Sequence, residues 1–317
     1  MESLSQILKQ FAEGPFMKSG EERAQQILQD PLILKFRQKH PELDEHTLRV
    51  NMNRLYQCVK EYKNCANCPG LERCPNDLQG HYAVLTVEQQ GTYSYIHETK
   101  AACKKQLAYA AEQTLRSRIR TYHVDDKAIL ENHSFEQIIG KDLERAKAVD
   151  QIQDYIIKTM EEGLQKKGLY LYGSFGTGKT FLMCYMLHKL AKEGHTGAIV
   201  YMPDFAEDLK GMFGDAGALR ETIEALKDTD VLIFDDIGAE NLNPWLRDHV
   251  LGAILNYRMN RKPTFFTSNY DLDSLEKHLS FTNKDGDEEH KGQRIMDRIR
   301  PFVDKVEVLG ENKRGQS

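Results

Sequence analysis

The spacing of apolar side chains changes along the chain and divides it into an N-terminal and a C-terminal part. In the first part, apolar positions recur every three or four residues, which is typical of amphipathic helices. The residues with this spacing are Leu4, Ile7, Leu8 and Phe11, and further on Leu48, Leu55, Cys58, Val59 and Tyr62. Pro, Gly and Asn interrupt the periodicity over residues 64–82, and residues 82–99 alternate like a β-hairpin that turns at Gln90 and Gly91. We therefore expect a small, mainly helical N-terminal module.

From Phe135 onward, segments with helical periodicity alternate with short apolar runs typical of strands. The expected helices cover residues 142–165, 179–193, 204–213, 217–227 and 244–260, and the expected strands cover residues 168–172, 198–202, 231–235 and 264–268. Strands that alternate with helices in this way predict an α/β fold, with a parallel sheet covered by helices on both faces. The strand "VLIFD" at 231–235 is apolar throughout, as expected for a central strand.

The segment between these two patterns has little apolar content. Residues 106–134 contain the basic, helix-like stretch "LRSRIR" followed by "HVDDKAILENHS", and we interpret them as a linker. The sequence therefore predicts an N-terminal domain of residues 1–105 and a C-terminal domain of residues 135–317. At 317 residues, the chain is long enough for two domains that each have a core.

The sequence "GSFGTGKT" at residues 173–180 matches the phosphate-binding pattern G-x-x-x-x-G-K-[ST] at every fixed position. Its glycines let backbone N–H groups turn toward phosphate oxygens, and the helix that begins at Lys179 adds its positive end. Lys179 can contact the β- and γ-phosphates, and the Thr180 hydroxyl can bind Mg²⁺. A glycine-rich turn without a ligand is the alternative, but the strand before the loop and the apolar helix after it favour phosphate binding. The residues expected around ATP are Gly173, Ser174, Phe175, Gly176, Thr177, Gly178, Lys179, Thr180 and Phe181.

Polar side chains also follow two of the other expected strands. Asp235 ends the strand "VLIFD", and Asp236 comes directly after it. A carboxylate buried at a strand end is costly unless a cation compensates it, so we assign Asp235 to Mg²⁺ and Asp236 to polarising the attacking water. Asp236 is one methylene shorter than a glutamate, which would slow hydrolysis. Asn269 follows strand 264–268, where its amide could orient that water or contact the γ-phosphate; an ordinary turn residue is the alternative.

Five of the six cysteines lie before residue 104, and this clustering suggests a metal site. Cys65-x2-Cys68 has the form of a zinc knuckle. Four of the five residues Cys65, Cys68, Cys74, His81 and Cys103 would complete a structural zinc site, and the spacing does not choose between Cys74 and Cys103. A redox Cys-x-x-Cys pair is the alternative, but no thioredoxin-like βαβ pattern surrounds it. Zinc would stabilise a segment that has few core residues.

Charge and composition narrow the classes of function. The formal net charge is −5, with +2 over residues 1–130 (18 Lys and Arg against 16 Asp and Glu) and −7 over the remainder (25 against 32). The chain as a whole therefore does not attract nucleic acid, and any DNA contact must be local. No apolar run approaches the ~18 residues of a membrane span, and "MESLSQILKQF" lacks the pattern of a signal peptide. We expect a cytoplasmic protein without a membrane partner, whose cysteines stay reduced.

The order of these motifs resembles that of AAA+ ATPases. "DDIGAE", "TSN" and "GQRIMDRIR" are similar to the helicase-loader branch of that superfamily, the DnaC/DnaI/IstB family, and the cysteine-bearing N-terminal half resembles its DnaI members from Gram-positive bacteria. The resemblance is strong over residues 135–308 and rests on fewer positions before them. It implies a P-loop AAA+ core preceded by a small helical, zinc-binding domain. Because the chain ends soon after the strand-like "FVDKVEVL", we expect no C-terminal helical lid.

The resemblance also implies roles for residues outside the phosphate loop. Members of the family hydrolyse ATP at subunit boundaries with an arginine from a neighbouring subunit, which here matches Arg298, with Arg294 as a second contact to the nucleotide. The two are four residues apart and so share one expected helix face; a solvated basic face is the alternative. The helix at 204–213 corresponds to a segment that touches single-stranded DNA, so Lys210 would contact a phosphate and Phe213 would stack on a base. From the residues alone, Phe213 would be a core residue and Lys210 a surface residue.

The motifs predict an ATPase with ATP, Mg²⁺ and Zn²⁺ as cofactors, and the resemblance implies that it loads the replicative DNA helicase onto single-stranded DNA during primosome assembly. By resemblance, residues 1–105 hold the hexameric helicase, the ATPase domain contacts single-stranded DNA, and copies of the chain associate at their ATP sites. One alternative is an IstB-like transposition ATPase, against which the zinc module argues. Another is an adaptor that uses ATP occupancy as a switch with little turnover. The short Asp236 and the expected absence of a helical lid are consistent with this alternative.

Overall fold

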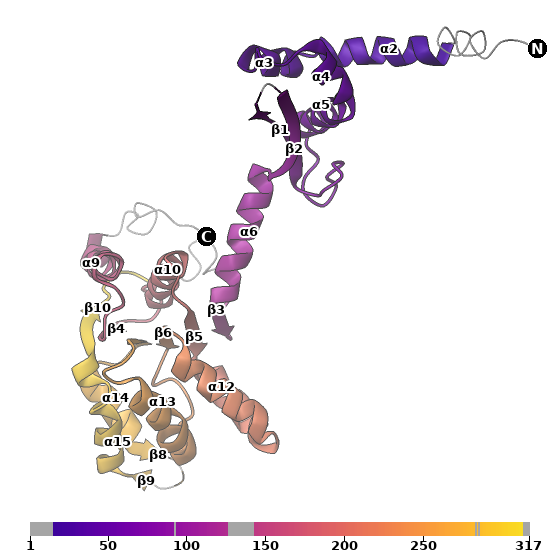
Figure 1. Cartoon of the computed structure of the whole chain (residues 1–317). Coiled ribbons are helices and arrows are strands. Elements are labelled where there is room, and N and C mark those ends of the chain that lie inside the picture. Colours follow the sequence, from indigo (N-terminus) through magenta and orange to yellow (C-terminus); the bar gives the residue numbers. More distant parts are fainter. Residues whose placement is uncertain (1–14, 92, 126–142, 283, 285, 313–317) are drawn as a thin grey trace, which may run out of the picture. The chain divides into compact units, whose positions relative to one another are not determined.

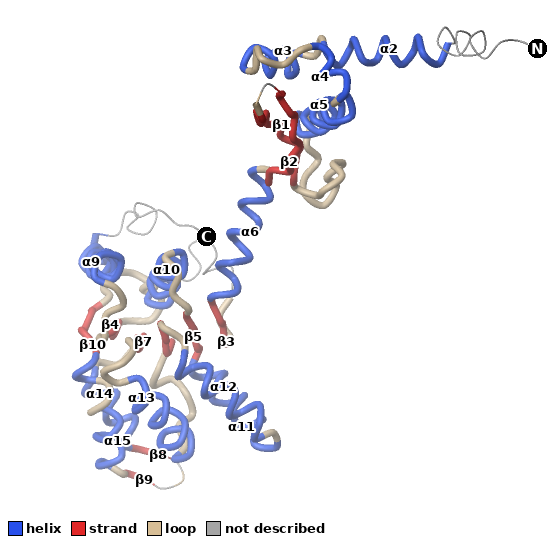
Figure 2. Tube along the Cα trace, viewed as in Figure 1, coloured by secondary structure: helices blue, strands red, loops and turns tan. Residues whose placement is uncertain are grey.

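The computed structural model describes residues 15–91, 93–125, 143–282, 284 and 286–312. The chain forms two compact units, Met1–Ala111 and Glu112–Ser317 (Figure 1). In the first unit, helices precede a β-hairpin; in the second, helices surround a parallel sheet (Figure 2). None of the helices in these described ranges is long and apolar enough to cross a membrane.

The N-terminal unit consists of short helices and an antiparallel hairpin. Its elements are α2 (Pro15–Leu28), α3 (Pro31–Lys39), α4 (Glu45–Val50), α5 (Met52–Ala66), β1 (His81–Gln90) and β2 (Tyr93–Ala102). Asp30 and Asp44 begin α3 and α4, because each carboxylate accepts a hydrogen bond from an N–H group in the first turn. The hairpin predicted over residues 82–99 is confirmed, and Gly91 in its turn has a φ of 65°, which favours glycine.

The core of this unit lies between the helices and the hairpin. It contains Leu28, Ile33, Leu43, Leu48, Leu55, Val59 and Ile96. Cys58 is buried as well, which confirms its place on the apolar face of α5, whereas Tyr62 is 58% exposed. The prediction for Tyr62 is wrong because its neighbour Glu61 is the residue that turns toward the hairpin. The apolar positions predicted between residues 4 and 11 lie outside the described part of the chain.

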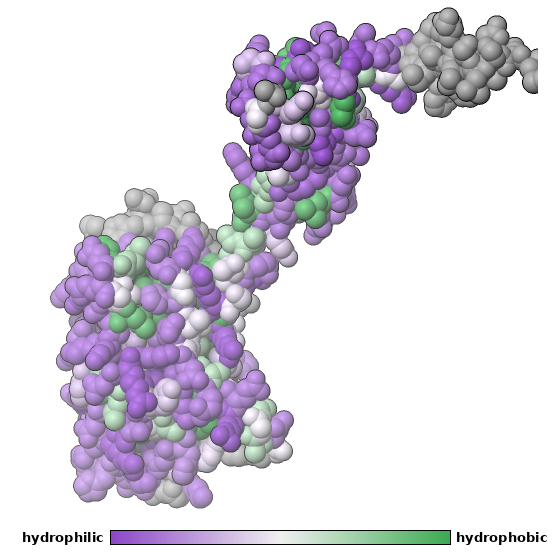
Figure 3. Space-filling model, viewed as in Figure 1, coloured by the Kyte–Doolittle hydropathy of each residue, from purple (hydrophilic) through white to green (hydrophobic). Residues whose placement is uncertain are grey.

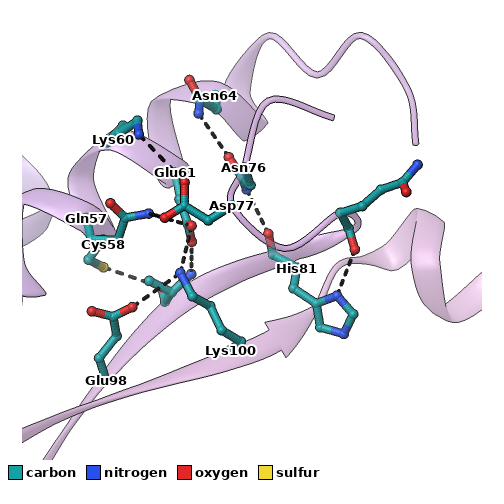
Figure 4. Close-up of polar contacts among 12 residues, drawn as sticks. Gln57, Cys58, Lys60, Glu61, Asn64, Asn76, Asp77, His81, Glu98 and Lys100 are labelled. Carbon is teal, nitrogen blue, oxygen red and sulfur yellow. Dashed lines mark hydrogen bonds and ion pairs between the residues drawn. The ribbon is translucent and has the colours of Figure 1, made fainter. Parts of the chain in front are cut away.

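Glu61 is a fully buried carboxylate at the interface of α5 and the hairpin. It accepts hydrogen bonds from the N–H group of Ala83 in β1, from Lys100 Nζ in β2 (2.6 Å) and from Gln57 Nε2 (2.8 Å) (Figure 4). Burial opposes the ionisation of Glu61, but the hydrogen bonds from Lys100, Gln57 and Ala83 outweigh it, so the pKa of Glu61 is lowered. This ionised side chain joins α5 to both strands of the hairpin.

The segment expected to be a linker is largely structured. α6 (Lys104–Arg118) is followed directly by β3 (Ile119–Tyr122), which pairs in parallel with β5 (Gly197–Tyr201). The linker expected over residues 106–134 therefore differs from the structure up to residue 122, and residues 126–134 lie outside the described ranges. Leu115 is the one buried residue of α6, and β3 is an edge strand. Such elements need few apolar residues, which explains why the composition resembled that of a linker.

The second unit is built on a sheet of six parallel strands in the order β10-β4-β7-β6-β5-β3. Its other strands are β4 (Gly168–Tyr172), β6 (Val231–Asp235), β7 (Thr264–Ser268) and β10 (Val303–Glu307). The strands predicted at 168–172, 231–235 and 264–268 are confirmed, and the strand predicted at 198–202 begins and ends one residue earlier. β6, the apolar "VLIFD", is buried and lies inside the sheet as predicted.

Helices cover both faces of this sheet, which confirms the predicted α/β fold (Figure 2). One core lies under α9 (Ala146–Glu162) and α10 (Lys179–Lys192). The core on the other face includes residues of α11 (Met202–Gly211), α12 (Ala216–Asp228), α13 (Gly252–Arg258), α14 (Leu272–Ser280) and α15 (Glu289–Met296). The helix predicted at 244–260 begins as a π-helix, η3 (Leu246–Leu251), and continues as α13. Short elements complete the unit: η1 (Leu143–Arg145), η2 (Met212–Gly214), η4 (Arg300–Phe302), β8 (Phe281–Thr282) and β9 (Gly286–Asp287).

The strand order decides which loops meet. Because β7 lies between β4 and β6, the carboxyl ends of these three parallel strands lie side by side at one edge of the sheet. The glycine-rich loop follows β4, Asn269 follows β7, and Asp235 ends β6. Figure 3 shows that the visible face of the molecule is mainly hydrophilic, with scattered apolar patches. The fold therefore brings together polar residues that are almost 100 positions apart in the sequence.

Candidate nucleotide-binding site

The glycine-rich loop between β4 and α10 borders a cleft of about 310 Å³. The cleft is lined by Phe175, Gly176, Gly178, Lys179, Thr180, Phe181, Tyr201, Asp235, Asp236, Thr267 and Asn269. Gly176 and Gly178 have φ values of 76° and 90°, in the left-handed region that favours glycine. Gly178 is also the N-cap of α10, so the positive end of that helix faces the loop. Of the nine residues expected around ATP, six line this cleft, and Gly173, Ser174 and Thr177 form the rest of the loop.

Lys179 is held inside the loop. Its side chain is largely buried, and Nζ donates hydrogen bonds to the carbonyl oxygens of Gly173 (2.9 Å) and Ser174 (2.8 Å) and to Asn269 Oδ1 (2.9 Å). These contacts place the ammonium group between the loop and the end of β7. An anionic phosphate oxygen is a stronger acceptor than any of these neutral oxygens, so the group is well placed to bind phosphate.

Asp235 is held by two threonine hydroxyls. Thr180 Oγ1 lies 2.9 and 3.0 Å from its two carboxylate oxygens, and Thr267 Oγ1 donates to Oδ1 at 2.6 Å. Burial, and then the neighbouring charge of Asp236, raise the pKa of Asp235, while the two threonines and Lys179 oppose this shift. A divalent cation would stabilise the ionised form. The hydroxyl and carboxylate oxygens present are the ligand types that Mg²⁺ prefers, so these residues fit the metal.

Thr267 is a residue that the sequence analysis missed. Besides donating to Asp235, its hydroxyl oxygen accepts the backbone N–H of Asp236 at 2.8 Å. It lies in β7 and is fully buried. The available signal was a second threonine near the end of the strand "TFFTS", but only the sheet order shows that this strand lies next to β6.

Asn269 connects the other polar groups of the cleft. Its Oδ1 accepts from Lys179, and its Nδ2 donates to Asp236 Oδ1 at 2.8 Å. Asp236 itself has a φ of 56°, which turns the chain away from the strand directly after Asp235. The structure thus brings together Lys179, Thr180, Asp235, Asp236 and Asn269, the five residues that three separate motifs supplied.

Arg294 and Arg298 do not share a helix face as expected. α15 ends at Met296, so Arg298 lies beyond the helix. There its guanidinium donates to the Arg294 carbonyl oxygen and to Asn256 Oδ1 (3.4 Å). Burial and the neighbouring charge of Arg294 lower the pKa of Arg298, and an additional anion would relieve that repulsion. Among the described residues that line the cleft, neither arginine appears.

The residues expected to contact DNA lie at the end of α11. Lys210 is in its last turn, and its Nζ forms an ion pair with Glu207 at 2.6 Å. DNA phosphate would therefore compete with a carboxylate for this lysine. Phe213 lies in η2, and its side chain is not among those described.

The residues expected to bind zinc do not form a metal site in the structure. No three His, Cys, Asp or Glu side chains are close enough to hold a metal ion within the ranges that the structure describes. Each cysteine sulfur instead has its own hydrogen-bond donor: Asn76 Nδ2 for Cys65, Lys105 Nζ for Cys68, Gly80 N for Cys74 and Gln106 N for Cys103. His81 Nδ1 lies 2.9 Å from the carbonyl oxygen of Gln79.

Two family models match the chain. The model described as "Primosomal protein DnaI N-terminus" matches residues 1–108, and the model described as "IstB-like ATP binding protein" matches residues 79–317. Together they cover both units, and the second covers the whole cleft described above.

Similar proteins support the same relationship. The chain is 32% identical to the replicative helicase loader DnaI of Bacillus subtilis (strain 168) over 317 residues, 99% of both chains. It is 31% identical over 120 residues to an insertion sequence IS1162 putative ATP-binding protein of Pseudomonas fluorescens, which covers 37% of this chain and 51% of that protein. A crystal structure of DnaI superposes with a TM-score of 0.51 at 35% identity, over 63% of this chain and 99% of that one. The protein therefore belongs to the DnaC/DnaI/IstB family of helicase loaders, and its second unit lies within the part that matches the IstB-like ATP-binding model.

Proposed function

We propose that this protein loads the replicative DNA helicase onto single-stranded DNA at the start of DNA replication, in the cytoplasm, and that ATP drives or controls the process. The observation that carries the proposal is the cleft in which Lys179, Thr180, Asp235 and Asn269 converge, in a chain that resembles a replicative helicase loader along 99% of its length. The match to an insertion-sequence protein covers much less of the chain, so an IstB-like role in transposition has weaker support.

Each residue of the cleft has a separate role in ATP hydrolysis. The backbone N–H groups of the loop and Lys179 bind the phosphates, and Thr180 with Asp235 would hold Mg²⁺, which neutralises phosphate charge when bound. Asp236 accepts a proton from, or orients, the attacking water, and Asn269 fixes the carboxylate of Asp236 through its 2.8 Å hydrogen bond. The Thr267 hydroxyl forms hydrogen bonds with both the Asp235 carboxylate and the Asp236 backbone N–H, and so fixes the position of one aspartate relative to the other.

An adaptor that binds ATP but hydrolyses it slowly is the second candidate. The supporting observation is that Asp236 Oδ1 already accepts a hydrogen bond from Asn269, and an aspartate reaches less far than a glutamate. Binding and release of ATP alone would then switch the protein. Steady-state ATPase rates with and without helicase and DNA separate the two candidates.

Different parts of the chain would contact the helicase, other copies of the chain and single-stranded DNA. We propose that residues 1–105 bind the helicase, that copies of the chain associate at their ATP sites with Arg298 completing the neighbouring site, and that Lys210 and Phe213 contact single-stranded DNA. The match of residues 1–108 to the DnaI N-terminal model supports a separate role for this part. Release of Lys210 from Glu207 would be required before a DNA phosphate could bind.

A loading assay tests the proposed function. The purified chain, the replicative helicase of the same organism and a circular single-stranded DNA with an annealed, forked oligonucleotide are mixed with ATP, ADP or a non-hydrolysable analogue. We expect unwinding only when the chain and ATP are present, because a closed helicase ring cannot thread onto a circle. If the chain neither binds the helicase nor increases unwinding, the proposal is wrong.

We also propose, from the cysteine spacing, that residues 1–105 bind one structural zinc ion. Two features of the structure support this. First, hydrogen bonds from the Gly70 backbone and from Lys105 lower the pKa of Cys68, which favours the thiolate form that binds metals. Second, Cys74 and Cys103 approach the same residue, since Gly80 N donates to Cys74 Sγ and Gly80 O accepts from Cys103 N.

Metal analysis of the full chain tests the zinc proposal. We expect about one equivalent of zinc, and chelation should lower the melting temperature of the N-terminal unit. Cys74→Ser and Cys103→Ser separate the candidate ligands, because only the true ligand should lose the metal. Cys184→Ser, in the ATPase unit, is the matched control. A metal-free wild type would show that the knuckle is only a pair of thiols.

A further inference from the structure

The motif "DDIGAE" contains a third acidic residue, Glu240, to which the proposed function gives no role. Its side chain is fully buried, in the loop that follows β6 and begins at Asp236. Glu240 Oε2 accepts the backbone N–H of Gly238 at 2.7 Å, and its Oε1 lies 3.2 Å from Nε2 of His278 in α14. A buried carboxylate is costly unless it has such partners. Glu240 therefore fixes the shape of this loop and joins it to α14.

The same loop packs against the chain that follows Asn269. Gly238 has a φ of 95°, and a Cβ atom placed on it would lie 2.7 Å from Tyr270 Cδ2, so the loop backbone lies directly against the Tyr270 ring. That ring stacks on the ring of His278, with centroids 6.1 Å apart. Asn269, directly before Tyr270, forms the 2.8 Å hydrogen bond to Asp236. The two residues proposed to handle the attacking water are therefore adjacent to this packed group and held by it.

Other hydrogen bonds hold the strand ends from which these two segments leave the sheet. Ser268 Oγ donates to the Ile237 carbonyl oxygen at 2.6 Å and accepts the Tyr270 N–H at 3.1 Å. Tyr170 Oη donates to the Tyr270 carbonyl oxygen at 2.7 Å. Because these bonds do not involve Glu240, we expect the strand ends to keep their structure when Glu240 is replaced. The loss would then be one of alignment in the cleft.

We propose that Glu240 and His278 are positioning residues for ATP hydrolysis, which align Asp236 and Asn269 with the attacking water. The inference rests on the proposed hydrolysis of ATP in this cleft. A group that accepts a proton from water must lie within hydrogen-bond distance of it, and a misplacement of about 1 Å can cost on the order of a hundredfold in rate. The loop that would bind the phosphates precedes a different helix, α10, so ATP affinity should change little.

The test measures ATP turnover by the full chain with helicase and single-stranded DNA, together with ATP affinity and melting temperature. Glu240→Leu keeps the approximate size of the side chain but cannot accept the Gly238 N–H. We expect kcat to fall on the order of tenfold, while the dissociation constant of ATP stays within about twofold of wild type. Glu240→Gln should retain most of the activity, because its amide oxygen can still accept that N–H.

A second background separates positioning from a general support of the fold. Asp236→Ala removes the residue through which Glu240 would act. Adding Glu240→Leu to this variant should therefore lower the residual turnover by less than about twofold. If Glu240 acted independently of Asp236, the double variant would lose roughly another tenfold.

The matched control is Lys277→Ala. Lys277 is exposed and directly precedes His278 in α14, so this variant changes the same helix and leaves the partner of Glu240 in place. It should hydrolyse ATP as wild type does. If Glu240→Leu does not fold, His278→Ala takes its place, because the His278 side chain is 23% exposed and its removal disturbs the core less. We expect a several-fold fall in kcat at unchanged ATP affinity.

Two results would overturn the inference. One is a folded Glu240→Leu protein whose kcat stays within about twofold of wild type. The other is a loss of turnover that is equal in the wild-type and Asp236→Ala backgrounds, or that comes with an equal loss of ATP affinity, which would make Glu240 a support of the whole domain. A wild type that does not hydrolyse ATP even with helicase and DNA would refute the proposed hydrolysis and this inference with it, so the two failures are distinguishable.

Discussion

Lys179→Ala is expected to abolish tight ATP binding while the protein remains folded. In the structure, Lys179 Nζ contacts Gly173 O, Ser174 O and Asn269 Oδ1, so the ammonium group is fixed within the cleft before any phosphate arrives. A hydrogen bond to a charged group contributes about 1.5–3 kcal/mol, and the lost attraction to the phosphates adds to this. We therefore expect ATP affinity to fall on the order of a hundredfold or more.

The measurement is a titration of wild type and variant with a fluorescent ATP analogue, together with their circular dichroism spectra and melting temperatures. Lys192→Ala is the matched control, because Lys192 is the last residue of α10 and is exposed. It should leave the dissociation constant unchanged. Unchanged affinity in a folded Lys179→Ala protein would remove the phosphate-binding role of this lysine.

The core of the candidate site could be predicted because short sequence motifs determine it. Loop 173–180 and the acidic end of β6 each contain their functional groups within a few residues, and the flanking apolar runs fix the strands before them. The order of the strands, which places these loops side by side, comes from the structure and was not predicted. The signal for Asn269 was its position after the phosphate loop and the acidic strand end along the chain, and in the structure it forms hydrogen bonds with Lys179 and Asp236.

The contribution of Thr267 could not be predicted in this way. Thr267 acts on Asp235 and Asp236 from a neighbouring strand. A threonine is not unusual at this position in the sequence. Its contacts depend on the order of the strands in the sheet, and periodicity or spacing carries no information about that order.

The errors in the fold have a related cause. α6 and β3 are poor in apolar residues because one is exposed and the other lies at the sheet edge, so composition alone made them look like a linker. In α5, the helical period correctly selected a buried face but not its end, where Glu61 rather than Tyr62 is buried. A buried carboxylate becomes favourable only through Lys100 and the other donors, which lie far away in the sequence.

Arg298→Ala is expected to leave ATP binding nearly intact and to remove most of the stimulated ATP turnover and helicase loading. The proposed reason is that Arg298 completes the ATP site of a neighbouring copy, so its guanidinium acts only after assembly. In the structure it lies beyond the end of α15, next to Arg294, where mutual repulsion favours the approach of an anion. Arginines supplied by a neighbouring molecule are worth ~10³–10⁵ in rate in GTPases, although a slow loader could show less.

ATP hydrolysis in the presence of helicase and single-stranded DNA measures this effect, and two further variants serve as controls. Arg261→Ala removes an exposed arginine that stacks on Tyr257, 5.1 Å from the ring centre, and should hydrolyse ATP as wild type does. Arg294→Ala shows whether the neighbouring arginine shares the role. A much larger loss in Arg298→Ala than in Arg294→Ala would support the assignment.

Mixing two inactive variants tests whether the arginine acts between copies. In an assembly of Lys179→Ala and Arg298→Ala chains, some interfaces would join the intact ATP site of one chain to the intact Arg298 of its neighbour. Such interfaces should restore part of the turnover, and the restored fraction should vary with the ratio of the two variants. If Arg298 instead acted within its own chain, no mixture could combine both functional groups in one site. An absence of recovery, in mixtures shown by native mass spectrometry to contain both variants in one complex, would therefore assign the missing arginine elsewhere, with Arg294 as the next candidate.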